Sequence, residues 1–428
     1  MEPTQVPAWL DEHGIDWIKT EGISLDGPII GKHIGRRKFV SALPLGNAIT
    51  ELVFGYDLGG TPYLAWWDDW RLAALGDIHQ RPDLSTLVVA PDRPRTANVI
   101  CDTVSTDGTP LPVCPRSTLR RVVDRVAEHG FTSKAAFEIE GMVFNDSIAD
   151  ARTRGYRGLS PMGHPAPLGY LQLNSREQLV FVDEVLTRLD GLGIPVEGWH
   201  DEAAPGQFEF NLDPADPITA ADRVIRVKQV LREVAADQGR IVTFMAKVND
   251  EYGNGLHVHH SIARDGEPVF HIPDGGEFSE TARHWIGGIV ASMHAAVSVL
   301  CPTINSYRRM VGFAAAPTLA SWAEDNKSAA LRVLPRSAKG ARIEHRVAGG
   351  DANPYLAFSA IIAAGLDGVE RQLVPAPPLE GSAYDADGQR MPTTLAEAVD
   401  LLDRSAFARA AFGDRVVDHY VNSGRHEV

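Results

Sequence analysis

The sequence is poor in cysteine and has no long hydrophobic run. Only three cysteines, Cys101, Cys114 and Cys301, occur among its 428 residues, and no two form a C-x-x-C pair. A disulfide framework and a structural zinc cluster are therefore not expected. No apolar stretch reaches the roughly 18 residues of a membrane span, and no basic segment leads into an apolar run near the N-terminus. We therefore expect a reduced, cytoplasmic protein without a membrane anchor.

Positive charge is scarce relative to negative charge. The chain has 41 Lys and Arg residues against 56 Asp and Glu residues, which gives a formal net charge of −15. Surfaces that bind nucleic acids or anionic membranes are usually basic, so we expect neither partner. Two nucleotide-binding signatures, G-x-x-x-x-G-K-[ST] and G-x-G-x-x-G, are also absent. The missing first signature excludes a P-loop enzyme.

The composition is otherwise that of a globular protein with two or three domains. Hydrophobic residues make up 44% of the chain and charged residues 23%. The region up to about residue 110 is rich in short β-branched segments separated by Gly, Pro or Asp, which are typical of strands. The clearest of these segments are AITELVFGYDL (48–58), STLVVAP (85–91) and ANVICDTV (97–104).

A helix is expected where this strand-rich region ends. Residues 114–130 have helical spacing, with Ser117 as the cap and Gly130 as the stop. We place a domain boundary near residues 110–116. Beyond it the chain mixes helices and strands without an internal repeat. Helices are expected in residues 175–193, 218–239, 353–373 and 395–413, and strands in residues 241–248, 257–263 and 341–348.

The stretch FEIEG, residues 137–141, places two glutamates on one side of an expected strand. Side chains at i and i+2 of a strand share a face, so Glu138 and Glu140 lie side by side while Phe137 and Ile139 face the other way. Two adjacent carboxylates among core residues repel each other unless something pairs with them. The stretch therefore predicts a neutralising partner.

Further polar side chains occur in otherwise apolar strands. HDEAAPGQFEF holds Glu202 and Glu209 on either side of a Pro-Gly turn, and YGNGLHVHHSI places His257 and His259 on one strand face. Glu344 lies in ARIEHRV between two arginines. Such oxygen-rich sets suit Mg²⁺ or Mn²⁺, whereas zinc more often takes further His or Cys ligands. A single strand glutamate is more often a solvated outer residue, so spacing leaves both interpretations open.

Cationic side chains are concentrated in one part of this acidic chain. Arginines together with metal-binding carboxylates are the equipment of phosphoryl transfer, because both offset the charge of the transferred group. The carboxylates alone would also allow a metal-dependent hydrolase. The cationic residues are Arg308, Arg309, Lys327, Arg332, Arg342 and Arg346.

Taken in order, these motifs resemble those of the glutamine synthetase superfamily. FEIEG resembles the family's E-x-E strand, EAAPGQFEF its E-(V/A)-A-P-G-Q-x-E segment, and GNGLHVHHS its G-S-G-M-H-x-H-x-S strand. TFMAKV, NSYRRM, APTLASWAEDNKSAALRV and RIEHRVAGGDANPYLAFSAIIAAGLDG also follow the family order. Upstream, GDIHQRPDLSTLVVAPDRP resembles the end of the family's N-terminal domain, so the resemblance covers residues 75–425.

The resemblance implies an α+β fold with two domains. Residues 1–112 would form a β-grasp N-terminal domain, and residues 113–428 a catalytic domain built on a curved antiparallel sheet. Family members stack in rings, usually two hexamers, so we expect a homododecamer with active sites between subunits. The implied reaction phosphorylates the γ-carboxylate of glutamate with ATP, after which an amine displaces phosphate to give an amide.

The resemblance also implies metal and nucleotide contacts, position by position. Glu140, Glu202 and Glu209 would hold one metal, and Glu138, His257 and Glu344 would hold a second that bridges the phosphates of ATP. Arg332 and Arg342 match contacts to the nucleotide phosphates, and His259 and Ser261 match positions on the nucleotide side.

Substrate contacts follow in the same way. Arg309 and Arg346 match positions that bind the glutamate carboxylate and the γ-phosphoryl region. Gly253 and Asn254 fall in the segment that contacts glutamate, although the usual N-G-S-G is altered here to Y-G-N-G. Lys327 stands where the family usually has arginine, which keeps the charge without the bidentate fork.

Departures from the family pattern bear on which amine is the substrate. Members that use ammonia have a flap glutamate before the A-P pair, whereas VGFAAAPT has Ala315 at that place. The ammonium-site aspartate of the family's D-G-S-S has only Asp57 as a weak counterpart. Fewer carboxylates favour a larger, partly apolar amine. Nearby lie Trp66, Trp67 and Trp70, which suit such a pocket or the core, and Asp68 and Asp69, which suit a polyamine.

Three interpretations follow. We favour a γ-glutamyl ligase for an organic amine, such as an alkylamine, ethanolamine, a polyamine or an aniline. The alternative within the same chemistry is glutamine synthetase proper, which uses ammonium. A non-catalytic, ring-forming structural or regulatory relative is the alternative of another class. All six implied metal ligands are present, which argues against that last interpretation.

Overall fold

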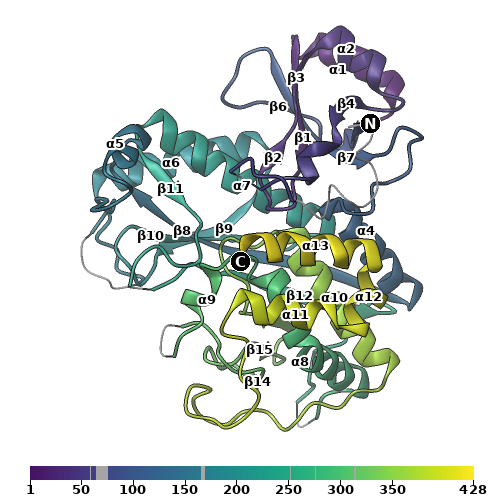
Figure 1. Ribbon diagram of the computed structural model, residues 1–428, viewed down its shortest axis with the longest axis vertical. Helices are drawn as coiled ribbons and strands as arrows, with labels where there is room; N and C mark the ends of the chain where they lie inside the picture. The colour runs from purple at the N-terminus through teal and green to yellow at the C-terminus, as the bar shows by residue number, and fades with distance from the viewer. Residues whose placement is uncertain (58, 64–75, 165–168, 251, 275, 313–314) are drawn as a thin grey trace.

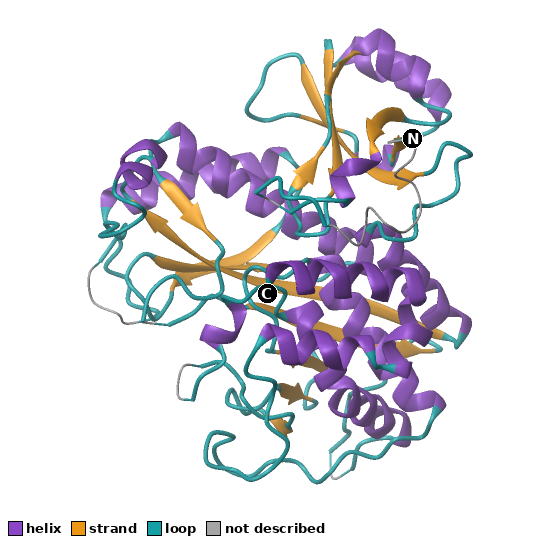
Figure 2. Ribbon diagram, in the orientation of Figure 1, coloured by secondary structure: helices purple, strands orange, loops and turns teal. Residues whose placement is uncertain are grey.

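Two β-sheets and a layer of helices give the chain a mixed α+β architecture (Figure 1). The computed structural model describes residues 1–57, 59–63, 76–164, 169–250, 252–274, 276–312 and 315–428. Figure 2 shows a small sheet near the N-terminus beside a larger, curved sheet that is covered by helices. Among the described helices, none combines the length and apolar character needed to span a bilayer.

The small sheet is built from the first hundred residues and mixes strand directions. Its central strands β1 and β7 are parallel, and the other pairs are antiparallel. Helices α1 (Val6–Glu12) and α2 (Arg36–Ala42) bury Val6, Leu10 and Phe39 against it. The order is β2 (Ile29–Ile30), β1 (Trp17–Ile23), β7 (Thr96–Val104), β5 (Asp77–Pro82) and β4 (Asn47–Thr50), with β3 (His33–Gly35) on β1 and β6 (Val88–Val89) on β7.

Two strands expected in this region are shorter than predicted. The strand of residues 48–58 stops at Thr50, because the Thr50 hydroxyl accepts a hydrogen bond from the Leu52 amide and begins a 3₁₀ turn, Glu51–Phe54. Likewise, Asp83 caps the turn Leu84–Thr86, which leaves only two paired residues in the strand of residues 85–91. Side-chain caps therefore replaced strand pairing at both places.

The large sheet is antiparallel except at one edge, where β14 and β15 run parallel. The predicted curved antiparallel sheet is thus confirmed, with this one exception. Its order is β14 (Trp322–Glu324), β15 (Leu331–Leu334), β16 (Arg342–His345), β12 (Leu256–Arg264), β8 (Phe131–Phe144), β10 (Gln207–Leu212) and β9 (Val196–Asp201). The short strands β11 (Ile241–Thr243) and β13 (Glu267–Pro268) pair with β8 and β12.

The helices expected from the sequence are present, with differences at their ends. Ser117 is not a cap: Cys114 is the cap residue of α4, Pro115 is its first residue, and Ser117 is buried inside the first turn. Proline is favoured at the first helical position, which explains the earlier start. The expected helices are α4 (Pro115–Glu128), α6 (Arg176–Gly191), α7 (Pro217–Asp237) and α10 (Pro354–Glu370). The structure adds three that we did not expect, α5 (Ile148–Thr153), α8 (Glu280–Leu300) and α9 (Ser306–Arg309).

A short segment connects the two sheets. The C-terminal end of the chain forms a helix that we did not expect. The last strand of the small sheet ends at Val104 and α4 begins at Pro115, and we propose the domain boundary in this segment. At the other end the tail forms α11 (Leu395–Asp403), α12 (Ala406–Phe412) and α13 (Asp414–Glu427).

The strand expected over residues 241–248 also ends early. Only Ile241–Thr243 pair with β8. The Lys247 amide donates to the side-chain oxygen of Asn305 at 2.8 Å instead of to a neighbouring strand. The residues after Thr243 therefore form a loop along the edge of the sheet.

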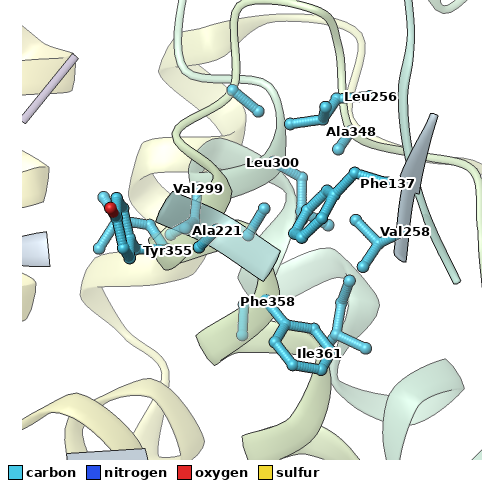
Figure 3. Close-up of a cluster of buried hydrophobic side chains, with 14 of the residues drawn as sticks. Phe137, Ala221, Leu256, Val258, Val299, Leu300, Ala348, Tyr355, Phe358 and Ile361 are labelled. Carbon is cyan, nitrogen blue, oxygen red and sulfur yellow. The ribbon is translucent and has the colours of Figure 1, made fainter. Parts of the chain in front are cut away.

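The main core lies between the large sheet and the helices. Figure 3 shows Phe137 packed among Val258 of the neighbouring strand and Phe358 and Ile361 of α10. The Phe137 and Phe358 rings meet edge to face, with their centroids 6.4 Å apart. Because side chains alternate along a strand, burial of Phe137 on this side directs Glu138 to the opposite face.

Candidate active site

A polar pocket of about 210 Å³ lies on the face of the large sheet opposite the core. It collects side chains from strands far apart in the sequence. Its lining residues are Glu138, Glu140, Tyr170, Glu202, Ala203, Gln207, Glu209, Tyr252, Gly253, His257, Arg309, Ala315, Lys327, Arg332, Glu344 and Arg346. All six expected metal ligands are among them.

The strand register explains how these side chains meet. Glu140 on β8 lies opposite Glu209 on β10, and Glu138 lies opposite His257 on β12. His259, two residues after His257 on β12, lies opposite Glu344 on the neighbouring strand β16. Side chains of directly opposed residues on one face approach within about 5.5 Å. Antiparallel pairing therefore brings the carboxylates and histidines together.

Glu138 contacts two histidines, His257 and His259. Its two carboxylate oxygens lie 3.0 Å from His257 Nδ1 and 2.7 Å from His259 Nε2. Burial opposes ionisation of Glu138, but the hydrogen bonds from both histidines hold its pKa well below its usual range. Glu138, His259 and Glu344 can bring one ligand atom each within 4.8 Å of one another, as can Glu138, Glu209 and His257.

A second group of possible ligands forms around His200. Ligand atoms of His200, Glu202 and Glu209 lie within 4.8 Å of one another, and His200 Nε2 is 3.1 Å from Glu202. The ring of His200 stacks on Tyr170, with centroids 4.3 Å apart. Sequence reasoning missed both residues, although the position of His200 in the motif HDE, beside Glu202, was a usable signal.

The carboxylates crowd one another in a way that favours a cation. Burial, together with the negative charges of Glu138 and Glu140, raises the pKa of Glu209 to about 9. Glu140 is relieved in part by the Gly255 amide, which donates to it at 2.6 Å. A set of buried oxygen ligands with mutual repulsion has the chemistry that a hard divalent cation requires. The residues therefore fit Mg²⁺ or Mn²⁺.

Arginines line the same pocket beside Glu344. Arg332 Nη1 donates to Glu344 at 2.9 Å, and Arg346 donates to the other oxygen of Glu344. Arg309 donates to the backbone oxygens of Val347 and Arg346 at 2.9 and 3.2 Å. Burial raises the pKa of Glu344, but the charge of Arg346 outweighs this effect and lowers it. The guanidinium groups are thus held in fixed orientations beside the carboxylates.

Not all of the other cationic and nucleotide-contacting residues that we predicted line the pocket. Lys327 lines the pocket, whereas Arg308 is exposed and does not. Arg342 lies outside the lining but its Nε donates to His259 Nδ1 at 3.0 Å. Ser261 lies two residues beyond His259 on β12 and does not line the pocket.

The Y-G-N-G segment supports the fold with one residue and lines the pocket with another. Asn254 is completely buried, and its side chain bonds the Met245 oxygen at 2.8 Å and Gln207 at 3.1 Å. It therefore does not reach the pocket, whereas Gly253 does. A Cβ at Gly255 would lie 2.7 Å from His257 Nε2 and 2.9 Å from an Arg309 nitrogen, so any larger residue there would displace side chains of the site.

The residues that we associated with the amine are only partly described. Ala315 lines the pocket, has a left-handed backbone (φ +57°), and accepts a hydrogen bond from Arg346 at 3.4 Å. Asp57 lies elsewhere, bonded to the Thr61 amide at 2.8 Å and to His426 at 3.2 Å, so it is no part of this pocket. Trp66, Trp67, Asp68, Asp69 and Trp70 lie outside the described residues.

Comparison with known proteins places these features in a family. The sequence model described as glutamine synthetase, catalytic domain, matches residues 112–428. A glutamate–isopropylamine ligase of Pseudomonas is 33% identical over 431 residues, covering 97% of this chain and 92% of the relative. A γ-glutamylethanolamide synthetase of Streptomyces coelicolor is 37% identical over 353 residues, covering 82% of this chain and 76% of the relative.

Other relatives bear on the alternatives. A glutamine synthetase of Thermus thermophilus is 33% identical over 374 residues, covering 82% of this chain and 81% of the relative. A solved structure described as apo GmaS without ligand superposes with a TM-score of 0.85 at 28% identity, covering 99% of this chain and 95% of the other. The similarity therefore extends over the small sheet as well as the large one.

Proposed function

Because this chain belongs to the glutamine synthetase family of ATP-dependent carbon–nitrogen ligases, we propose that it joins the γ-carboxylate of glutamate to an organic amine through a γ-glutamyl phosphate. The observation that carries the proposal is the pocket itself. Carboxylates, His257 and arginines line it together, and Ala315 stands in place of the flap glutamate.

The pocket is suited to ATP and two divalent cations. We propose that Glu140, Glu202 and Glu209 hold one cation, with His200 beside them, and that Glu138, His257 and Glu344 hold the other. Bound cations would supply charge neutralisation to the phosphate oxygens. Arg332, Arg342, His259 and Ser261 would contact the nucleotide.

The protein's own cations would stabilise the transferred group. Arg309, Arg346 and Lys327 are the residues that we assign to this role, and Arg309 and Arg346 would also bind glutamate near Gly253. The two arginines are oriented before substrate arrives, because Arg346 is bonded to Glu344 and Arg309 is bonded to the backbone oxygens of Arg346 and Val347, which follow β16. Charged donors arranged in advance stabilise developing negative charge without reorganisation.

The choice of amine separates our proposal from glutamine synthesis. Ammonium is bound best by oxygen-lined, anionic pockets, and an alanine at residue 315 removes one carboxylate from that position. Two of the relatives are named for organic amines, isopropylamine and ethanolamine. A pocket with fewer charges and more room favours an amine that carries an apolar group.

The test is phosphate release from ATP and glutamate in the presence of single amines. We expect turnover with at least one of isopropylamine, ethanolamine, aniline, methylamine or a polyamine, at a kcat/KM at least tenfold above that with ammonium. Turnover with ammonium and with none of the organic amines would establish the glutamine synthetase alternative instead.

A metal-binding measurement tests the non-catalytic alternative. Calorimetry should show saturable binding of Mn²⁺ to the purified protein and a loss of at least tenfold in affinity in Glu138→Ala, because Glu138 takes part in two of the possible ligand groups. Glu177→Ala changes an exposed carboxylate outside the pocket and should bind as the parent does. No Mn²⁺ binding by the parent would favour the non-catalytic relative.

We also propose a cytoplasmic ring assembly of twelve copies with active sites between subunits. Support comes from the family to which the chain belongs. Light scattering on the purified protein measures the mass of the assembly, and a monomer that turns over amines would contradict the shared site.

A further inference from the structure

Asp325 is not among the described residues that line the pocket, but it holds an arginine that is. It directly follows β14, the edge strand of the large sheet, and its amide donates to the Val333 oxygen of β15 at 3.0 Å. Parallel pairing of these two strands places Arg332 opposite Ala323, two residues before Asp325 (Figure 1). The Asp325 carboxylate therefore meets the Arg332 guanidinium at the edge of the sheet.

The guanidinium of Arg332 is held at all three of its nitrogens. Nε and Nη2 both donate to Asp325 Oδ1, at 2.8 and 2.7 Å, and Nη1 donates to Glu344 at 2.9 Å. Such hydrogen bonds between charged groups are the strong kind. Each Nη atom still carries a second hydrogen, which can serve a ligand in the pocket.

The two carboxylates that hold Arg332 differ in their other contacts. Glu344, whose side chain is 1% exposed, also accepts from Arg346 and is one of the proposed metal ligands. A cation bound to Glu344 would compete for the oxygen that Arg332 uses. The side chain of Asp325 is 67% exposed, and within the described chain Arg332 is the only cation within 4.0 Å of it. Asp325 is therefore the partner that stays with Arg332 when Glu344 binds a metal.

The backbone at Asp325 restricts which residue can do this. Its φ of +46° lies in the left-handed region, which aspartate and asparagine adopt more readily than other residues apart from glycine. Only the first two of these three combine that conformation with an acceptor oxygen on the side chain.

We propose that Asp325 is a positioning residue, which keeps the Arg332 guanidinium directed at the phosphates of ATP. The inference rests on the proposed function, in which Arg332 contacts the nucleotide. Asp325 acts through Arg332 and touches no substrate itself. Its negative charge, taken alone, opposes the binding of a polyanion, so a favourable effect on ATP comes from orientation.

The experiment is calorimetric titration of the full chain with a non-hydrolysable ATP analogue in the presence of Mg²⁺. Asp325→Gly removes the acceptor and tolerates the left-handed backbone, whereas Asp325→Asn removes the same charge but keeps an oxygen at this position. We expect Asp325→Gly to bind the analogue about fivefold more weakly than the parent, and Asp325→Asn within about twofold of it. Because both variants lose the charge, the difference between them measures orientation.

A neighbouring ion pair provides the matched control. Arg336 donates to Glu324 at 2.6 and 2.9 Å, and neither is among the described residues that line the pocket. Glu324→Ala should therefore bind the analogue as the parent does. Every variant should retain the Mn²⁺ binding that depends on Glu138, which shows that the pocket has folded.

Three results would overturn the role of Asp325 in a parent that binds the analogue. They are equal affinity of Asp325→Gly and Asp325→Asn, tighter binding by Asp325→Gly than by the parent, and a loss in Glu324→Ala as large as that in Asp325→Gly. No binding by the parent itself would contradict the proposed function, and the role of Asp325 in ATP binding with it.

Discussion

Ala315 is the residue that connects backbone conformation with amine selection. Its φ of +57° lies in the left-handed region, where a residue other than glycine carries a cost, and its oxygen is bonded to Arg346. Any change at this position therefore acts on both the backbone and the pocket. A charged and a neutral substitution of equal size separate the two effects.

We predict that Ala315→Glu raises the ratio of ammonium to organic-amine turnover at least tenfold, because a carboxylate there binds a small cation and fills the space of an apolar group. Ala315→Gln is the matched control, since it adds the same volume and backbone cost without the charge. Phosphate release measures both variants. Equal ratios for the two variants would show that charge at residue 315 does not select the amine.

Asp26 is a residue whose ionisation opposes folding. Burial, with the nearby charges of Asp57 and Glu427, raises its pKa from 3.8 to about 6. The folded state therefore holds this proton more tightly than the unfolded state does. Its stabilising effect is complete below pH 3.8, and it is lost as the pH rises through 6.

We predict that Asp26→Asn raises the free energy of unfolding at pH 7.5 by up to about 3 kcal/mol, because asparagine resembles the protonated acid. The gain should shrink as the pH falls from 6 towards 4. Thermal unfolding followed across this range measures the effect. A variant that is less stable than the parent at pH 7.5 would show that the carboxylate is paired in solution.

The sequence predicted the strands of the site but not how these strands pair. Alternation within FEIEG and HVHHSIA predicted strands with one polar face, and the structure confirms both. Pairing between strands was not predictable, because register depends on contacts between distant segments. That is why His200, which lies opposite Glu209 on β9, was missed. Element ends were wrongly predicted where local effects decide them: the Thr50 side chain caps a 3₁₀ turn and ends a strand early, and Pro115 starts α4 before the expected cap, Ser117.

Strand β8 has a core residue, Phe137, directly before the site residue Glu138. We predict that Phe137→Ala lowers the free energy of unfolding by about 3 to 5 kcal/mol, because a fully buried ring is removed from the contact with Phe358. Phe137→Leu keeps most of the volume and should cost less than about 1.5 kcal/mol. Thermal unfolding distinguishes the two. A larger loss in the leucine variant than in the alanine variant would contradict this packing argument.

At the scale of the whole molecule, one buried arginine joins the small sheet to the helices. Arg116 is 1% exposed and donates to Asp83, Asp102 and Asp222 at 2.6 to 3.0 Å. Asp102 belongs to β7 and Asp222 to α7, and Asp222 also accepts from the Tyr355 hydroxyl. This network fixes how the two parts of the chain meet.

We predict that Arg116→Met destabilises the protein by about 3 to 5 kcal/mol, because it leaves the buried carboxylate of Asp222 without a cation and leaves Asp83 and Asp102 with only Arg120 nearby. Arg120 offers a matched control: it lies 3.5 Å from Asp102, but its side chain is 44% exposed. Arg120→Met should cost less than about 1 kcal/mol. Scanning calorimetry measures both variants, and similar losses in the two would show that Arg116 is not the main link.

The division of β8 into an apolar and an acidic face also has a consequence for folding. If β8 slipped by one residue against β12, Glu138 and Glu140 would enter the core and Phe137 and Ile139 would face the pocket. Burying two unpaired carboxylates costs far more than a strand pairing returns. The charges of the site thus act as a check on strand register before any substrate is bound.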